Sequence, residues 1–171
     1  MKKNRNLYEI NMISILSIVL TIVIIGFFNN ADALLNDQES NNNQISNASK
    51  EFIINLFANV NSASNEYQNE LAKGKESINN NNNMTIVNKT NEYTGKLEKI
   101  ISLAKEYNIQ EEYKPLLKNY INSLQNEIES YFHYKNYILT GNNTENKLSL
   151  DLLSKALNYE TEAIKEFKQL Q

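Results

Sequence analysis

Residues 113–141 read YKPLLKNYINSLQNEIESYFHYKNYILTG, and this stretch decides the fold class. Its apolar and aromatic side chains recur every three or four residues, the spacing of one face of an α-helix. Pro115 suits the first turn of a helix, where its missing N–H has no partner. Gly141 suits the residue after the last turn, because glycine accepts a positive φ without strain. We therefore predict a helix over about 113–140.

An earlier start is the alternative for this helix. Asn108 and Glu111 resemble a capping box, in which side chains at the start of a helix satisfy its free N–H groups. A helix that began at Asn108 would contain Pro115 and should be kinked there.

The same periodicity continues on both sides of this stretch. From Ser49 onward apolar residues step by three or four, without strand-like alternation, and Gly or Asn punctuation separates four segments. Amphipathic segments joined by short polar links are typical of an up-down-up-down antiparallel four-helix bundle. We predict an all-α fold with helices over about 49–76, 85–107, 113–140 and 145–170.

The first 33 residues differ in character. Basic residues precede an uncharged run over 12–28, and the small residues Ala31 and Ala33 follow it. This is the three-part plan of a secretory signal peptide, with cleavage after Ala33. The run also approaches the length of a membrane-spanning helix, so an uncleaved anchor is the alternative. In both cases the bias of Lys and Arg toward the cytoplasm places the rest of the chain outside.

The expected organisation has three parts: a signal peptide or anchor over 1–33, a flexible Asn-rich tether over 34–48, and the four-helix bundle over 49–171. An uncleaved segment 12–28 makes the membrane a partner and holds the bundle at the cell surface. A cleaved segment makes the bundle a secreted protein. Another envelope protein is the expected protein partner.

Composition excludes several kinds of chemistry. The chain has no cysteine, which excludes disulfides, thiol catalysis and iron–sulfur ligation. Its 17 basic residues are interspersed among 20 acidic ones, a poor match to nucleic acid. His133 is the sole histidine, and its pairing with Glu129 one turn earlier is too small a set for a metal site. We expect no cofactor and, without a nucleophile elbow or phosphate-binding glycine loop, no enzyme.

Asparagine is abundant, and it creates four N-glycosylation sequons. Each lies in a segment that we expect to be a loop or a helix end. Nucleotide bias toward AU-rich codons is the alternative reason for so much Asn. The candidate sites are Asn47, Asn83, Asn88 and Asn142.

Tyrosines crowd the second half of the chain. Tyr131, Tyr134 and Tyr137 step by three and trace one slowly rotating edge of the predicted helix. Tyrosine combines a large contact area with a polar tip, and it is favoured where proteins meet partners. This edge is a candidate aromatic contact strip; the alternative is that the rings fill the core.

The segment 137–141 (YILTG) resembles the helix-end motif of the extracellular four-helix sensing modules of bacterial membrane receptors. Those modules sit between two membrane spans and feed a cytoplasmic signalling domain, whereas no second long apolar stretch follows the run over 12–28. The resemblance covers five residues and implies a sensing role. We expect an exported, non-enzymatic bundle that acts by surface interaction or as an envelope-structural element. The alternative is an extracytoplasmic, small-ligand-binding sensor bundle.

Overall fold

Long α-helices make up the part of the chain that the structure describes. The structure is a computed structural model and describes residues 41–76 and 82–170. No strand occurs in these residues, and the prediction of four helices in an all-α fold is confirmed there. In chain order the elements are α2 (Asn41–Glu76), α3 (Asn82–Glu106), the short 3-10 helix η2 (Glu111–Tyr113), α4 (Lys114–Thr140) and α5 (Asn143–Gln169).

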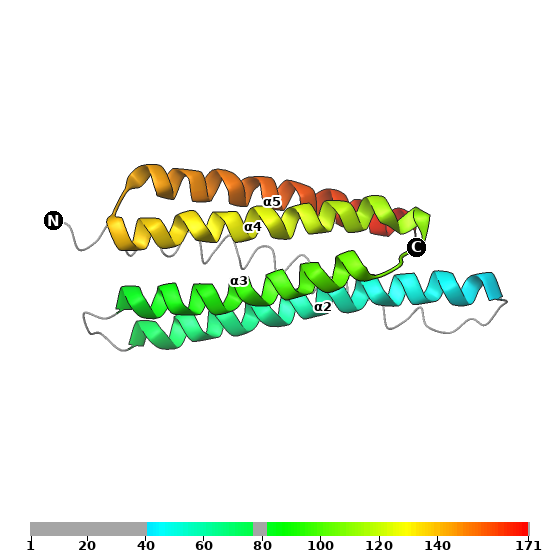
Figure 1. Ribbon diagram of the computed structural model, residues 1–171, viewed down its shortest axis with the longest axis horizontal. Coiled ribbons are helices and arrows are strands. Elements are labelled where there is room, and N and C mark those ends of the chain that lie inside the picture. The colour runs from blue at the N-terminus through cyan, green and yellow to red at the C-terminus, as the bar shows by residue number, and fades with distance from the viewer. Residues whose placement is uncertain (1–40, 77–81, 171) are drawn as a thin grey trace. The chain divides into compact units, whose positions relative to one another are not determined.

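Consecutive helices run antiparallel and form two hairpins. Figure 1 shows α2 beside α3 as one hairpin and α4 beside α5 as the other. Contacts between neighbouring helices give the same directions, because later residues of one helix meet earlier residues of the next. The pairs are Glu66–Lys96 and Glu70–Lys89 between α2 and α3, Asn83–Ile138 and Tyr93–Glu127 between α3 and α4, and Ser123–Ala156 and Ser130–Ser149 between α4 and α5.

Helix α4 has the ends that its sequence predicts. Pro115 lies in the first turn, so the alternative start at Asn108 is wrong. Asn108 instead lies between the end of α3 and the 3-10 turn η2. Gly141 ends the helix with a φ of 70°, and its N–H donates to the carbonyl oxygen of Tyr137 at 2.8 Å.

The other three helices start earlier than the predicted limits, and α3 begins at Asn82 rather than near residue 85. Helix α2 begins at Asn41, so the last part of the segment expected to be a tether over 34–48 is helical. Asn is a poor helix former, but extending an existing helix gains one hydrogen bond per residue and avoids a new nucleation step. Helix α5 begins at Asn143, and the Asn142 side chain caps it by accepting the Thr144 N–H at 3.0 Å.

Small residues join α4 closely to α5. The Ser123 hydroxyl donates to the carbonyl oxygen of Ala156 at 2.8 Å, and the Ser130 hydroxyl donates to the carbonyl oxygen of Ser149 at 2.8 Å. All four residues are buried. They recur at intervals of seven along each helix, and short side chains let two helix backbones approach one another. We call these four residues the small-residue seam.

Aromatic rings join the α2–α3 hairpin to α4. Tyr67 and Tyr93 stack with their centroids 4.8 Å apart, and the ring of Tyr131 stands nearly perpendicular to both at 5.5 and 5.4 Å. These three residues are the aromatic cluster. Helices α2 and α5 meet through the rings of Phe57 and Phe167, whose centroids are 5.7 Å apart.

Within residues 41–76 and 82–170, none of the helices has an apolar stretch of the length that a bilayer crossing requires. The apolar run over 12–28 and the predicted cleavage residues Ala31 and Ala33 lie outside the described residues.

Candidate functional site

Two glutamates are buried in the core of the bundle. Glu127 on α4 and Glu160 on α5 are each only 3% exposed. Tyr120 and Tyr134, seven residues on either side of Glu127, are buried too, and Leu153 and Phe167 flank Glu160 in the same way. The two carboxyl groups therefore occupy positions of the heptad pattern that otherwise hold large core side chains.

The two side chains incline toward one another. Helical side chains tilt toward the N-terminus of their own helix, and α4 and α5 are antiparallel. Glu127 and Glu160 therefore both lean toward the level of the hydrogen bond between Ser123 and Ala156, which lies between them along the hairpin. Consistent with this, the pKa of Glu160 is raised first by burial and then by the charge of Glu127.

One tyrosine hydroxyl bonds to a carboxyl group, and other buried tyrosines interact with the carboxyl groups electrostatically. The Tyr93 hydroxyl on α3 donates to Oε1 of Glu127 at 2.8 Å. Burial raises the pKa of Tyr120, and the charges of Glu160 and Glu127 raise it further. The Tyr67 hydroxyl on α2 is 2.9 Å from that of Thr90, which itself donates to the carbonyl oxygen of Ile86.

Three polar atoms of this group have no hydrogen-bond partner among the described residues. They are Oε2 of Glu127, Oε1 of Glu160 and the hydroxyl of Tyr120, and all three are buried. A buried polar atom without a partner costs about 1–3 kcal/mol, and more when it is charged. We call Glu127, Glu160, Tyr93 and Tyr120 the buried carboxyl cluster.

Burial sets the protonation of the cluster. It raises the pKa of Glu127 to about 7, although the hydrogen bond from Tyr93 works in the opposite direction. Burial, and then the charge of Glu127, raises the pKa of Glu160 to about 8. The pKa of Tyr93 also lies well above its ordinary value, first because of burial and then because of the Glu127 charge. The carboxyl groups thus exchange protons near neutral pH, while the phenols stay protonated.

The cluster is poorly suited to hold a metal ion. Among the described residues, no group of three or more His, Cys, Asp or Glu side chains is placed to bind one. Two carboxyl groups supply too few ligands for Ca²⁺, which takes six to eight oxygens. The ligand that two buried carboxyl groups accept most readily is a proton.

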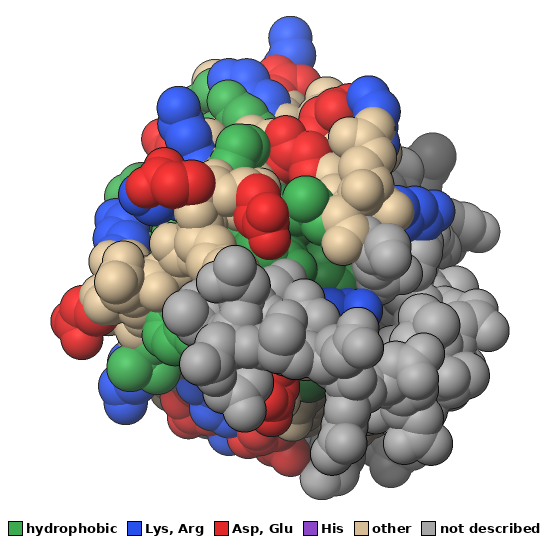
Figure 2. All heavy atoms as spheres, turned by 90° about the vertical axis from the view of Figure 1, so that its right-hand side faces the viewer, with side chains coloured by type: hydrophobic (Ala, Val, Ile, Leu, Met, Phe, Trp, Pro, Cys, Tyr) green, Lys and Arg blue, Asp and Glu red, His purple; other side chains and the backbone are tan. Residues whose placement is uncertain are grey.

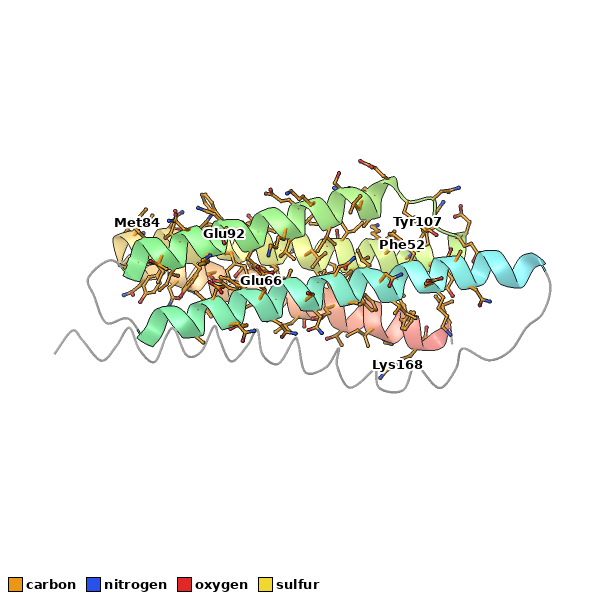
Figure 3. All side chains as sticks on the ribbon, turned by 90° about the horizontal axis from the view of Figure 1, so that it is seen from below. Phe52, Glu66, Met84, Glu92, Tyr107 and Lys168 are labelled. Atoms are coloured by element: carbon orange, nitrogen blue, oxygen red, sulfur yellow. The ribbon has the colours of Figure 1, made fainter. Side chains whose placement is uncertain are left out.

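A shallow hollow lies on the surface between α2 and α3, above the stacked rings of Tyr67 and Tyr93. Its volume of about 10 Å³ is room for about one water molecule. Two ion pairs join the helices across its rim, Lys96 with Glu66 at 2.6 Å and Lys89 with Glu70 at 3.6 Å, and Lys89 also pairs with Glu92 of its own helix at 2.9 Å. Figure 3 shows Glu66 and Glu92 on these two neighbouring helices. The rim is solvated charge, and such exposed pairs contribute little to stability.

The candidate contact strip lies in the core. Tyr131, Tyr134 and Tyr137 are 1%, 3% and 9% exposed, so their rings are not available at the surface of the folded bundle. Of the two interpretations, an exposed strip or rings that fill the core, their burial supports the second. Each three-residue step turns a helical side chain by about 60° from its predecessor. The rings follow the buried stripe of α4 rather than leaving it.

His133 has a different partner from the one considered in the sequence. Its Nδ1 lies 2.7 Å from Oε2 of Glu145 in the first turn of α5, and Glu129 is not its partner in this pair. Asn136 donates to the same carboxylate oxygen at 3.2 Å. These hydrogen bonds lower the pKa of Glu145, with His133 as the largest cause. The pair therefore ties the end of α4 to the start of α5.

The sequon asparagines are all exposed, but they do not all lie in loops. Asn47 and Asn88 lie within helices, and Asn83 lies in the first turn of α3. Asn83 donates to the carbonyl oxygen of Ile138, and Asn142 is the N-cap of α5. The side chains of Asn83 and Asn142 therefore already have structural roles.

Sequence reasoning missed the buried carboxyl cluster. The available signal was the spacing, since Glu127 continues the seven-residue series of Tyr113, Tyr120 and Tyr134, and Glu160 lies midway between Leu153 and Phe167. A carboxylate at such a position belongs to the core face of its helix.

Comparisons with known proteins returned no match to any family model, curated protein or solved structure.

Proposed function

We propose that this chain is an exported, non-enzymatic helical bundle that acts through its surface, as a binding or envelope-structural element. The N-terminal segment supports export, because it has the plan of a signal peptide: basic residues, then the apolar run over 12–28, then the small pair Ala31 and Ala33. Retention of the run would hold the bundle at the membrane, and cleavage after Ala33 would release it.

The observation that carries the interaction role is the set of large apolar side chains left outside a filled core. Phe132 and Leu139, seven residues apart on α4, are 54% and 55% exposed. Met84 is 55% exposed and lies at the same end of the bundle as Leu139, because its neighbour Asn83 donates to the carbonyl oxygen of Ile138. Exposed apolar side chains that lie close together on one face are typical of a surface that binds a protein partner.

The surface charge does not favour nucleic acid. Figure 2 shows one end of the bundle, where Lys or Arg and Asp or Glu side chains are interspersed and neither sign forms a continuous patch on the coloured part of that face. The formal net charge of the chain is −3. Binding to phosphate backbones depends on clustered positive charge.

Photo-crosslinking in the native cell tests the interaction role. A photoreactive amino acid replaces Phe132 or Leu139 in two separate variants, and it replaces the exposed Gln125 of the same helix as a matched control. We expect a crosslinked partner from the two apolar positions and none from Gln125. Crosslinks of equal yield at all three positions, or at none, would contradict the proposal.

Cell fractionation and mass spectrometry of the intact chain test the location separately. We expect the chain in the membrane or external fraction. A mature N-terminus at Leu34 would establish cleavage, and an intact N-terminal segment in the membrane fraction would establish the anchor. A chain confined to the cytoplasm would contradict the proposed export.

A sensor bundle that takes up a small ligand is the second candidate. The buried atoms without hydrogen-bond partners in the carboxyl cluster favour it, because polar atoms inside a core can serve as ligand contacts. The hollow between α2 and α3 holds about one water molecule, so a larger ligand would require the helices to separate. Binding screens by thermal shift, with Tyr120→Phe as the matched variant, would test this candidate; no ligand-dependent shift would contradict it.

A further inference from the structure

The buried carboxyl cluster lies where the two helical hairpins meet. We propose that Glu127 and Glu160 form a proton-binding switch: protonated, they allow the α2–α3 hairpin to pack against the α4–α5 hairpin, and ionised together, they drive the hairpins apart. This inference concerns the core of the bundle and is independent of whether the chain is exported.

The small-residue seam of the α4–α5 hairpin contains no titratable group. The hairpin also has titratable contacts toward its two ends, His133 with Glu145 at 2.7 Å and Asn119 with Glu166 at 3.2 Å. The small-residue seam joins these helices through serine hydroxyls and backbone carbonyl oxygens, with both cross-helix bonds at 2.8 Å. Ionisation of the glutamates does not change the charge of the hydroxyl and carbonyl groups that form those hydrogen bonds. The α4–α5 hairpin should therefore persist as a unit when the switch operates.

The contact between the hairpins depends on the charge of the cluster. The groups that act electrostatically with Glu127 and Glu160 are Tyr67 from α2, Tyr93 from α3, Tyr120 from α4 and the other glutamate, and none of them is cationic. Two carboxylates would thus repel one another in a medium of low polarity, and no cation among the described residues acts on them to offset the repulsion.

Hydrogen bonding does not compensate both charges either. Tyr93 donates to one oxygen of Glu127, while the other oxygen of Glu127 and Oε1 of Glu160 have no partner among the described residues. The Tyr120 hydroxyl is also buried and likewise has no hydrogen-bond partner there. A protonated carboxyl group can supply the missing donor, and an ionised one must gain it from water.

Water reaches the cluster most easily where the hairpins separate. Between α2 and α5 the rings of Phe57 and Phe167 meet edge to face, an apolar contact unlike the hydrogen bonds of the small-residue seam. The chain passes from one hairpin to the other through residues 107–113. Tyr107 stacks on Phe52 of α2 with the ring centroids 3.7 Å apart. Figure 3 labels both residues at this end of the hairpin. We therefore infer that residues 107–113 are the hinge about which the hairpins separate, with Tyr107 fixing one end of this segment to α2.

The absence of cysteine allows a direct distance measurement on the full-length chain in a mild non-ionic detergent. Asn59→Cys on α2 and Asn158→Cys on α5 carry spin labels that report the separation of the hairpins. Gln125→Cys with Asn158→Cys reports the α4–α5 hairpin and is the matched control pair. All three positions are exposed. Distances are measured at about pH 5 and about pH 9, on either side of both carboxyl pKa values.

We expect the Asn59–Asn158 distance to increase at the higher pH, while the Gln125–Asn158 distance stays constant. The double variant Glu127→Gln and Glu160→Gln should lose the response, and the exposed control Glu129→Gln should keep it. Glu160→Gln alone leaves the Tyr93–Glu127 hydrogen bond in place, and it should reduce the response even if the double variant does not fold.

Three results would overturn the proposal. The first is a constant Asn59–Asn158 distance in the unsubstituted core. The second is an equal response in the double glutamine variant. The third is an equal lengthening of the control distance, because that would show general unfolding rather than separation of the hairpins.

Discussion

Raising the pH should destabilise this bundle, and replacing its buried glutamates by glutamine should remove the effect. Unfolding returns both carboxyl groups to their ordinary pKa of 4.5, whereas the folded chain holds the pKa of Glu127 at about 7 and that of Glu160 at about 8. The folded state therefore binds more protons than the unfolded state between these values. Stability is highest below the unfolded pKa and is lost as the pH rises through the folded pKa values.

The size of the loss follows from the Glu127 pKa. One pKa unit corresponds to about 1.4 kcal/mol, so the rise from 4.5 to about 7 is equivalent to about 3 kcal/mol. The raised pKa of Glu160 adds to this loss of stability. Part of that rise comes from repulsion by Glu127, and this shared repulsion is counted only once. A loss of at least about 3 kcal/mol is large beside a total stability of about 5–15 kcal/mol.

Urea unfolding followed by circular dichroism, at several values between about pH 5 and about pH 9, measures this dependence. The free energy of unfolding should fall across the range in the unsubstituted chain and in Glu129→Gln. It should change far less in Glu127→Gln with Glu160→Gln, which should be the more stable protein at the alkaline end. A free energy that stays constant or increases with pH in the unsubstituted chain would refute the reasoning.

Three further predictions concern single contacts. Ala156→Leu should lower the free energy of unfolding in urea by about 1–3 kcal/mol, because the added atoms push α5 away from α4 at the small-residue seam. Ser123→Ala should lower it by less, about 1 kcal/mol, since it removes one hydrogen bond. Equal losses for the two variants would argue against close helix packing. Gly141→Ala should lower the thermal midpoint by the equivalent of about 1 kcal/mol. The space around an added Cβ is open to 4 Å, but a residue with a Cβ is strained at a φ of 70°. An unchanged midpoint would contradict the left-handed cap. Tyr93→Phe should raise the pKa of Glu127 further, as read by NMR of its labelled carboxyl carbon, because the hydrogen bond that lowers this pKa is lost; a lower pKa would contradict the assigned bond.

Part of the buried carboxyl cluster could be predicted from the sequence. The periodicity places Glu127 on the same face as Tyr120 and Tyr134, so spacing alone predicts that it shares the environment of these tyrosines. The same holds for Glu160, which lies midway between Leu153 and Phe167. What the spacing could not supply is the partner of each group, since the Tyr93–Glu127 bond joins residues 34 positions apart in the chain.

The tyrosines illustrate the same limit. Their spacing defines an edge of α4, but whether that edge faces solvent depends on which helices cover it. Tyr131 is buried because Tyr67 and Tyr93 pack against its ring from the other hairpin. His133 likewise meets Glu145 rather than Glu129, because the turn at Gly141 returns α5 alongside the end of α4.

The sequence by itself determined the helices of this protein, together with the start of α4 near Pro115 and its end at Gly141. These features depend on local backbone preferences and on the spacing of apolar residues, and both can be read along a single segment. Only the tertiary structure decided that two glutamates from different helices share one buried environment. Protonation there depends on which groups surround each carboxyl, and packing between helices brings those groups together from distant parts of the chain.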